Sequence, residues 1–219
     1  MPIELVIFDC DGVLIDSEVI CCRIEAEELR GLGYDYDPAE IARRFSGIPG
    51  AAMYPMMEAE SGIPIPAKVR GRVSRRIREA IVTELAAVPG AHEALAEIAG
   101  PVCVASSSGL DYLEQALGLV GLWRRFQPHV FSAQQVGRGK PAPDVFLFAA
   151  ERMVARPEAC IVIEDSPAGV QAGLAAGMRV IGFSGAGHCQ PGHAERLAGE
   201  GAHATLDDLR LLPDLLRSL

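Results

Sequence analysis

The stretch Leu5-Val6-Ile7-Phe8-Asp9-Cys10-Asp11-Gly12 decides the fold of this chain, because an apolar run ends abruptly in two aspartates and a glycine. Consecutive apolar residues without alternation are typical of a strand that is buried on both faces of a parallel sheet. Polar side chains directly after such a strand lie at the carboxyl edge of the sheet, where open α/β sheets bind their ligands. The stretch therefore predicts a buried strand with a polar site at its end.

Similar apolar runs recur along the chain, each followed by a polar residue or turn. They are Val102–Ala105 before Ser106, His129–Ser132, Ile161–Ile163 before Glu164 and Asp165, and Val180–Phe183 before Ser184. Helical patterns lie between them, at Leu110–Leu119, Asp144–Met153 and Ala168–Ala176, the last with Gly177 as a C-cap. This alternation predicts an α/β fold with a doubly wound, Rossmann-like parallel sheet. We expect Asp16 and Ser184 to be ordinary turn residues.

One long segment interrupts the alternation of strands and helices. From Ser17 to Ala87 the sequence has helical periodicity and no convincing buried strand, with an apolar stripe through Val69, Val73 and Ile77. Val88-Pro89-Gly90 then marks the return to the α/β pattern. The predicted layout is an α/β core of residues 1–16 and 88–219 with an inserted all-helical cap of residues 17–87.

The overall composition excludes several classes of partner. The formal net charge of −9 over 219 residues disfavours nucleic acid or an anionic membrane surface. No apolar run approaches the ~18 residues of a membrane span, and the start Met-Pro-Ile-Glu has no basic leader typical of a secretory signal. We expect a cytoplasmic protein with a small-molecule partner. The sequence leaves the oligomeric state open, and a monomer is compatible with it.

The cysteines show no pattern of a disulfide framework or a zinc site. None forms a C-x-x-C pair among Cys10, Cys21, Cys22, Cys103, Cys160 and Cys189. Several sit inside apolar runs, where cysteine usually behaves as a small buried hydrophobe. We therefore expect reduced cysteines without a metal-binding or redox role, as in a reducing compartment.

The polar residues at the predicted strand ends carry the chemistry. If Asp9, Asp11, Glu164 and Asp165 meet at one edge of the sheet, their charges repel. A like-charge pair ~4 Å apart costs about 4 kcal/mol at an effective dielectric near 20. Binding a cation or protonating one carboxyl relieves this repulsion, and clustered carboxylates suit Mg²⁺. The sequence therefore predicts a Mg²⁺ site, and one carboxyl with a raised pKa would supply a general acid.

Four segments together resemble the motifs of the haloacid dehalogenase superfamily. Phe8–Glu18 is similar to its first motif, D-x-D-G-[TV]-L-x-D-[ST], and Val104–Ser108 to its second, a strand that ends in Ser or Thr. Gly139–Phe146 resembles the third motif and Ile163–Gly169 the fourth. All four occur in family order over nearly the whole chain, and the gap after the first suits the helical cap of that superfamily.

The resemblance implies a role for each motif residue. Asp9 would attack phosphorus and form an aspartyl-phosphate, and Asp11 would act as general acid and then as general base. Ser106 and Ser107 would bind phosphoryl oxygens, and Lys140 would offset their negative charge. The implied Mg²⁺ ligands are Asp9, Asp165, the main-chain carbonyl of Asp11, and Glu164 either directly or through water.

Each motif also has a purely structural explanation. The Asp9–Gly12 segment resembles an ordinary polar turn, and Ser106–Ser108 suits a helix cap. Lys140 fits a loop lysine, and Glu164 with Asp165 fits solvated charges at a helix N-terminus. The joint occurrence of all four motifs favours the catalytic interpretation.

The expected activity is Mg²⁺-dependent hydrolysis of a small phosphorylated metabolite. The first motif has a second aspartate, Asp11. In this it resembles the branches of the superfamily that act on phosphate esters, including β-phosphoglucomutase and the sugar-phosphate and phosphogluconate phosphatases. The expected substrate is a sugar phosphate or a phosphorylated sugar acid such as 6-phosphogluconate. A phosphosugar mutase is the alternative. It is weakened because Gly50 stands where the mutase has a cap arginine and the mutase's hinge histidine is replaced near Cys21. A non-catalytic binding or regulatory member is the alternative from another class.

A basic cluster lies in the predicted cap. It comprises Arg43, Arg44, Lys68, Arg70, Arg72, Arg75, Arg76 and Arg78. Such a run is usually a solvated helix face. The alternative is that one or two of these cations attract an acidic substrate.

Overall fold

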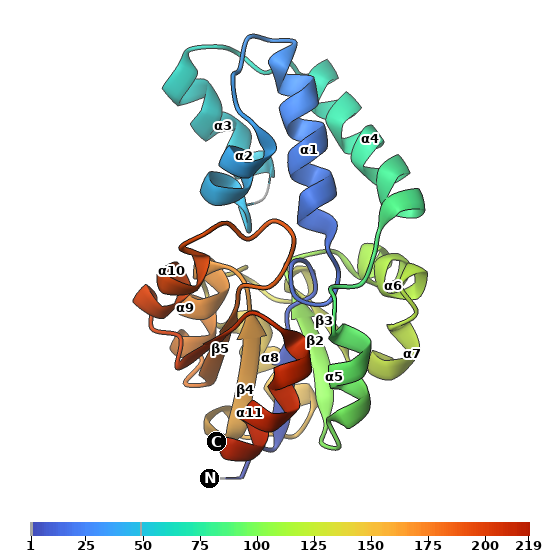
Figure 1. Ribbon diagram of the computed structural model, residues 1–219, viewed down its shortest axis with the longest axis vertical. Coiled ribbons are helices and arrows are strands. Elements are labelled where there is room, and N and C mark those ends of the chain that lie inside the picture. The colour runs from blue at the N-terminus through green and yellow to red at the C-terminus, as the bar shows by residue number, and fades with distance from the viewer. Residues whose placement is uncertain (1, 49) are drawn as a thin grey trace.

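A six-stranded parallel sheet forms the centre of the protein in the computed structural model, which describes residues 2–48 and 50–219 (Figure 1). Its strand order is β3-β2-β1-β4-β5-β6. The strands are β1 Leu5–Phe8, β2 Val102–Ser106, β3 Val130–Ser132, β4 Cys160–Glu164, β5 Arg179–Phe183 and β6 Ala204–Leu206. The predicted doubly wound α/β fold is confirmed, and the five predicted strands are present.

Helices cover both faces of this sheet. They are α5 Ala91–Glu97, α6 Leu110–Leu119, α7 Trp123–Phe126, α8 Asp144–Arg152, α9 Pro167–Ala175, α10 His193–Gly199 and α11 Leu212–Ser218. Short 3₁₀ turns are η1 Ala133–Gln135, η2 Pro157–Ala159 and η3 Leu209–Leu211. Side chains of β1 alternate between two cores, Val6 and Phe8 toward the α5, α6 and α7 side and Leu5 and Ile7 toward the α8 and α9 side. Both faces of the strand are buried, which explains its unbroken apolar run.

Four helices lie between β1 and α5 and form the cap above the carboxyl edge of the sheet (Figure 1). They are α1 Ser17–Arg30, α2 Pro38–Phe45, α3 Gly50–Ser61 and α4 Ala67–Glu84. Their apolar side chains form a core of their own, which includes the predicted stripe residues Val69 and Val73. The inserted helices are therefore present, while their behaviour as a separate domain bounded at residues 17 and 87 stays a prediction.

Two adjacent segments connect the cap to the sheet. The amide of Asp16 donates to the carbonyl of Ala86 at 3.0 Å, and the amide of Val88 donates to the carbonyl of Leu14 at 3.0 Å.

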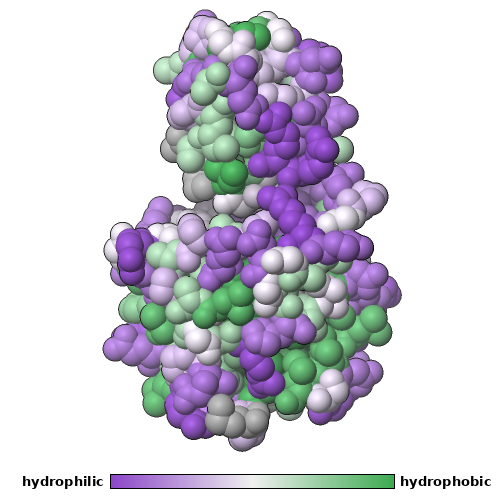
Figure 2. Space-filling view, turned by 90° about the vertical axis from the view of Figure 1, so that its left-hand side faces the viewer, coloured by the Kyte–Doolittle hydropathy of each residue, from purple (hydrophilic) through white to green (hydrophobic). Residues whose placement is uncertain are grey.

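In side view the molecule narrows between cap and core, and the visible surface is largely hydrophilic with scattered apolar areas (Figure 2). Within the described residues, none of the helices has the length and hydropathy needed to cross a membrane.

Candidate active site

The polar side chains at the strand ends converge at one edge of the sheet. Asp9 directly follows β1, Ser106 ends β2, and Glu164 ends β4 with Asp165 next in the chain. A cavity of about 350 Å³ lies over this edge, and these four residues line it together with Lys140. The parallel arrangement of the strands thus brings together residues that are far apart in the sequence.

Three buried carboxylates form the centre of the site. Oxygen atoms of Asp9, Glu164 and Asp165 all lie within 4.8 Å of one another. The Lys140 ammonium contacts the Asp9 carboxylate and lies 2.6 Å from Oε1 of Glu164. It also donates to the main-chain carbonyl of Ala105 at 3.1 Å. Lys140 therefore contacts two of the three carboxylates of this group.

The electrostatics of the cluster favour a divalent cation. Burial raises the pKa of Asp9 well above its ordinary value, and Glu164 and Asp165 raise it further against the opposing effect of Lys140. Burial alone would lower the pKa of Lys140, but its two carboxylate partners raise it. A divalent cation bound by the carboxylate oxygens would stabilise the ionised form of Asp9. Oxygen ligands of this kind fit Mg²⁺.

Both carboxylate oxygens of Glu164 are already engaged. Oε1 accepts a hydrogen bond from Lys140, while Oε2 accepts from the amide of Ser166 at 3.0 Å and from its hydroxyl at 2.9 Å. Helix α9 approaches so closely that a Cβ on Gly169 would lie 1.8 Å from Cδ of Glu164. This packing gives Glu164 a fixed orientation toward Lys140.

The Asp11 side chain does not join the group formed by the other three carboxylates. Its oxygens accept hydrogen bonds from the hydroxyls of Ser17 at 2.6 Å, Ser108 at 2.7 Å and Tyr112 at 2.9 Å. Asp11 still lines the same cavity as the other three carboxylates, as expected, and hydroxyls from three segments bind it at the cavity wall. Sequence reasoning missed these partners.

The serines after β2 occupy the wall of the same cavity. The Ser106 hydroxyl is buried and accepts a hydrogen bond from the amide of Ser108 at 3.0 Å. Ser107 is exposed and lines the cavity, and helix α6 begins three residues later at Leu110. The N-cap of α6 is Gly109 and no side chain caps the helix, so the expectation that these serines cap it is wrong.

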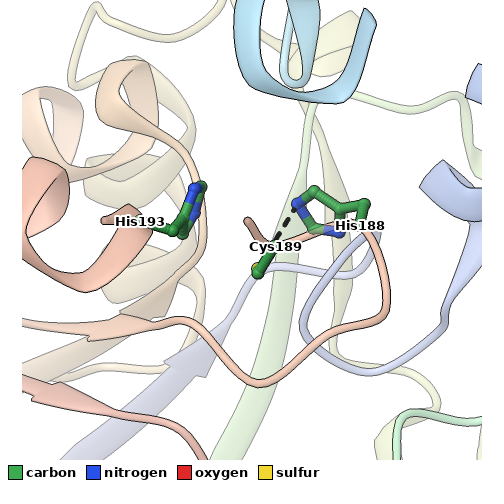
Figure 3. A group of neighbouring side chains, drawn as sticks. All are labelled: His188, Cys189 and His193. Carbon is green, nitrogen blue, oxygen red and sulfur yellow. Dashed lines mark hydrogen bonds between the residues drawn. The ribbon is translucent and has the colours of Figure 1, made fainter. Parts of the chain in front are cut away.

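A second group of side chains comes from the loop after β5, with His188 and Cys189, and from the start of α10, with His193 (Figure 3). Nε2 of His188 lies 3.1 Å from Oδ2 of Asp165, and the ring of His193 donates from Nε2 to the Asp165 carbonyl at 2.6 Å. Burial alone would lower the pKa of His188, but hydrogen bonds to Asp165 and Cys189 raise it to about 11. We had expected no histidine spacing near the cysteines that suggests a metal site, and the structure brings His188 and His193 close to Cys189. The signal in the sequence was His188-Cys189 followed by His193.

The cap side of the cavity is acidic and apolar rather than basic. Glu18, Cys21, Ile48 and Ile77 line it. Burial raises the pKa of Glu18 to about 7, and the hydroxyl of Ser46 donates to its carboxylate at 3.2 Å. A carboxyl group in this state can donate or accept a hydrogen bond near neutral pH.

The basic cluster of the cap lies outside the cavity lining. Five of its arginines pair with glutamates, in the pairs Arg44–Glu60, Arg70–Glu58, Arg72–Glu28, Arg75–Glu79 and Arg76–Glu27. These pairs are on the protein surface, which agrees with the solvated-face interpretation.

The stretch Gly47–Gly50 bears on the mutase alternative. It contains Pro49, which lies outside the described residues.

Comparisons with known proteins place this geometry among phosphatases. Residues 3–177 match the profile of a hydrolase family described as haloacid dehalogenase-like hydrolases. The chain is 34% identical over 190 residues to 6-phosphogluconate phosphatase of Escherichia coli, covering 86% of each chain. It is 33% identical over 183 residues to hexitol phosphatase A of the same organism, covering 80% of each. A haloacid dehalogenase-like protein of unknown function from Agrobacterium tumefaciens has a TM-score of 0.94 at 36% identity, with 99% of this chain and 98% of that chain covered.

Proposed function

The chain belongs to the haloacid dehalogenase-like hydrolase family and is a phosphatase, and we propose that it hydrolyses a small phosphorylated sugar or sugar alcohol in a Mg²⁺-dependent reaction. The observation that carries this proposal is the convergence of Asp9, Asp165 and Lys140 at one cavity. A nucleophile, a cation site and a fixed positive charge are the parts that phosphoryl transfer requires.

The reaction proceeds in two displacements at phosphorus. The Asp9 carboxylate attacks, a bond from phosphorus to its oxygen forms, and the bond to the sugar oxygen breaks. Asp11 donates a proton to the departing alkoxide, which is otherwise a poor leaving group. Asp11 then accepts a proton from water as the water attacks phosphorus, which releases phosphate and restores the Asp9 carboxylate.

The remaining residues bind and orient the phosphoryl group. Lys140 offsets the charge on Asp9 and on the phosphoryl oxygens, and the hydroxyls of Ser106 and Ser107 donate hydrogen bonds to those oxygens. Glu164 keeps Lys140 in place through its contact at 2.6 Å. Asp9, Asp165 and the main-chain carbonyl of Asp11 would bind Mg²⁺, which supplies further neutralisation of phosphoryl charge.

The lining of the cavity favours an uncharged sugar over a sugar acid. Lys140 is the one cationic side chain among the described lining residues, and it is already paired with two carboxylates. The cap side instead offers Glu18, whose pKa of about 7 suits a hydrogen bond to a hydroxyl and whose ionised form repels a carboxylate. We therefore place this chain nearer in specificity to a hexitol phosphatase than to a phosphogluconate phosphatase.

The same lining disfavours the mutase alternative. A mutase must bind a second phosphate group while its substrate reorients, and the described cap wall offers no cation for that group. The non-catalytic alternative is disfavoured because each residue with a proposed catalytic role is present and lines the cavity.

The test is phosphate release from three substrates of similar size. They are a hexitol phosphate, a hexose phosphate and 6-phosphogluconate, each assayed with Mg²⁺ and with EDTA. We expect release that requires Mg²⁺, with a higher kcat/KM for the two neutral sugars. No release from any of them would contradict a sugar phosphatase. Conversion of a hexose 1-phosphate to its 6-phosphate would support the mutase instead.

A further inference from the structure

His188, Cys189 and His193 place two imidazoles and a thiol around one point, outside the motifs that explain phosphatase activity (Figure 3). One ligand atom from each residue lies within 4.8 Å of the other two. His188 is buried, and Cys189 and His193 are half-buried. We propose that these three residues form a second metal site, selective for a borderline transition-metal ion such as Zn²⁺.

The separation of the donor atoms suits a tetrahedral ion. With Zn–S near 2.3 Å and Zn–N near 2.1 Å, sulfur and nitrogen ligands on one tetrahedral ion lie about 3.6 Å apart. Sγ of Cys189 lies 3.7 Å from Nε2 of His188. The centroids of the two imidazole rings are 5.8 Å apart, and the ring planes meet at 82°. In Figure 3 the thiol lies between the two rings.

The surroundings of His193 also prepare it as a ligand. Its Nε2 lies 2.6 Å from the carbonyl oxygen of Asp165, so that nitrogen must carry the proton of the hydrogen bond. The other nitrogen, Nδ1, then retains the lone pair that a metal requires. Metal-binding histidines usually donate their second N–H to a carbonyl or carboxylate in this way.

The donor set separates this site from the carboxylate cluster. Two nitrogens and a sulfur are poor ligands for Mg²⁺ and good ligands for Zn²⁺ or Co²⁺. Binding requires the Cys189 thiol to lose its proton to solvent. It also requires His188 to lose the Nε2 proton that it shares with Asp165, so that Nε2 exchanges this contact for the metal. Three protein ligands leave a fourth coordination position for water.

The proposed site would join the loop after β5 to the start of α10. His188 and Cys189 lie on that loop, and His193 is the first residue of the helix. The same loop contacts Asp16, the residue directly before the first cap helix α1, because the amide of Gly187 donates to Oδ1 of Asp16 at 3.2 Å. A bound ion would therefore fix the segment that packs behind Asp165.

Cobalt absorption tests the site without any assay of turnover. Reduced, metal-free protein is titrated anaerobically with Co²⁺ in the presence of excess Mg²⁺, which saturates the carboxylate cluster. We expect a thiolate-to-cobalt charge-transfer band that reaches its maximum at one equivalent and that disappears when Zn²⁺ is added. Absence of this band in the wild-type protein would overturn the proposal.

Variants identify the ligands. Cys189→Ser should abolish the band. His193→Ala removes a ligand and should weaken Co²⁺ binding by more than the roughly 10- to 100-fold that is typical when a hydrogen-bond partner of a ligand is removed. Cys21→Ser and His129→Ala, which alter a cysteine and a histidine elsewhere, should keep the band, as should Asp9→Asn. A band that survives in Cys189→Ser or is lost in Asp9→Asn would overturn the assignment. Circular dichroism of each variant checks that it is folded.

Discussion

At the scale of the residue, Asp9 is the carboxylate that we expect to be indispensable. It is buried, it contacts Lys140, and it directly follows the central strand β1. We predict that Asp9→Asn keeps the fold and loses at least about 10³-fold in kcat, since an amide cannot form the phosphorylated intermediate. Circular dichroism and phosphate release measured on the same sample check this. Appreciable turnover by pure, undeamidated variant would rule out Asp9 as the nucleophile.

Asp165 should determine the requirement for metal. Its carboxylate belongs to the buried three-carboxylate group, and His188 contacts it from the other side. We predict that Asp165→Asn raises the Mg²⁺ concentration for half-maximal activity by about tenfold or more, because the ion loses a charged ligand. Titration of activity with Mg²⁺ after EDTA treatment measures this. Asp214→Asn, which alters an exposed carboxylate paired with Arg217 outside the four motifs, is the control and should titrate like wild type. An unchanged requirement in Asp165→Asn would remove that residue from the ligand set.

Sequence patterns predicted the residues at strand ends better than the residues that support them. Asp9, Ser106 and Glu164 could be placed because parallel strands present their ends at one edge. Tyr112 could not, because its hydrogen bond to Asp11 spans 101 positions and depends on how α6 packs. The contact of His188 with Asp165 could not be predicted, because only the path of the loop after β5 brings the two residues together.

At the scale of the element, α9 depends on glycine where it passes the site. A methyl group on Gly169 would overlap the Glu164 carboxyl at 1.8 Å, whereas Gly118 in α6 has no atom within 4 Å of the same position. We predict that Gly169→Ala lowers the free energy of unfolding by about 3 kcal/mol and reduces activity, since Glu164 must leave Lys140. Gly118→Ala should instead stabilise by about 0.5–1 kcal/mol. Thermal and urea unfolding distinguish them, and equal effects would contradict the packing at α9.

Helix α1 should make the stability of the protein depend on pH. Burial, and then the neighbouring Glu18, raise the pKa of Glu25 from 4.5 to about 8. Between these values the folded protein retains a proton that the unfolded chain has lost, so the free energy of unfolding falls as pH rises from about 5 to 8. We predict that Glu25→Gln gains about 1 kcal/mol, or about 2–4 °C in Tm, at pH 8 and little at pH 5.

The matched control for this effect is Glu151→Gln on the exposed part of α8. Its difference in Tm from wild type should be the same at both pH values. A pH-independent gain in Glu25→Gln would show that the carboxyl at position 25 is not destabilised in the folded cap.

The strands that are buried were predicted from their apolar sequence, and the one that is mostly exposed was not. The five strands with continuous apolar sequence were expected, and each is buried along most of its length. Strand β6 was missed because it has three residues and is buried only at Leu206. An edge strand of this kind has neither the length nor the pattern that sequence periodicity detects.

At the scale of the whole molecule, the surface charges of the cap and the chemistry of the cavity should be independent. Arg72 and Arg76 pair with Glu28 on the cap surface and do not line the cavity. We predict that Arg72→Ala and Arg76→Ala change kcat/KM by less than about twofold for both acidic and neutral sugar phosphates. The free energy of unfolding should fall by at most about 1 kcal/mol. A KM raised only for the acidic substrate would instead show that these cations steer it.

The order of strands in the sheet has a consequence for biosynthesis. Strand β1 is translated before the other strands, yet its partners β2 and β4 follow about 100 and about 150 residues later. At roughly 5–20 residues per second, an apolar segment waits on the order of 5–20 s for its first neighbour. The cap helices can form locally during that interval, whereas β1 remains open to chaperones or to aggregation. A ribosome that pauses before β4 would prolong the exposure of the strand that positions Asp9.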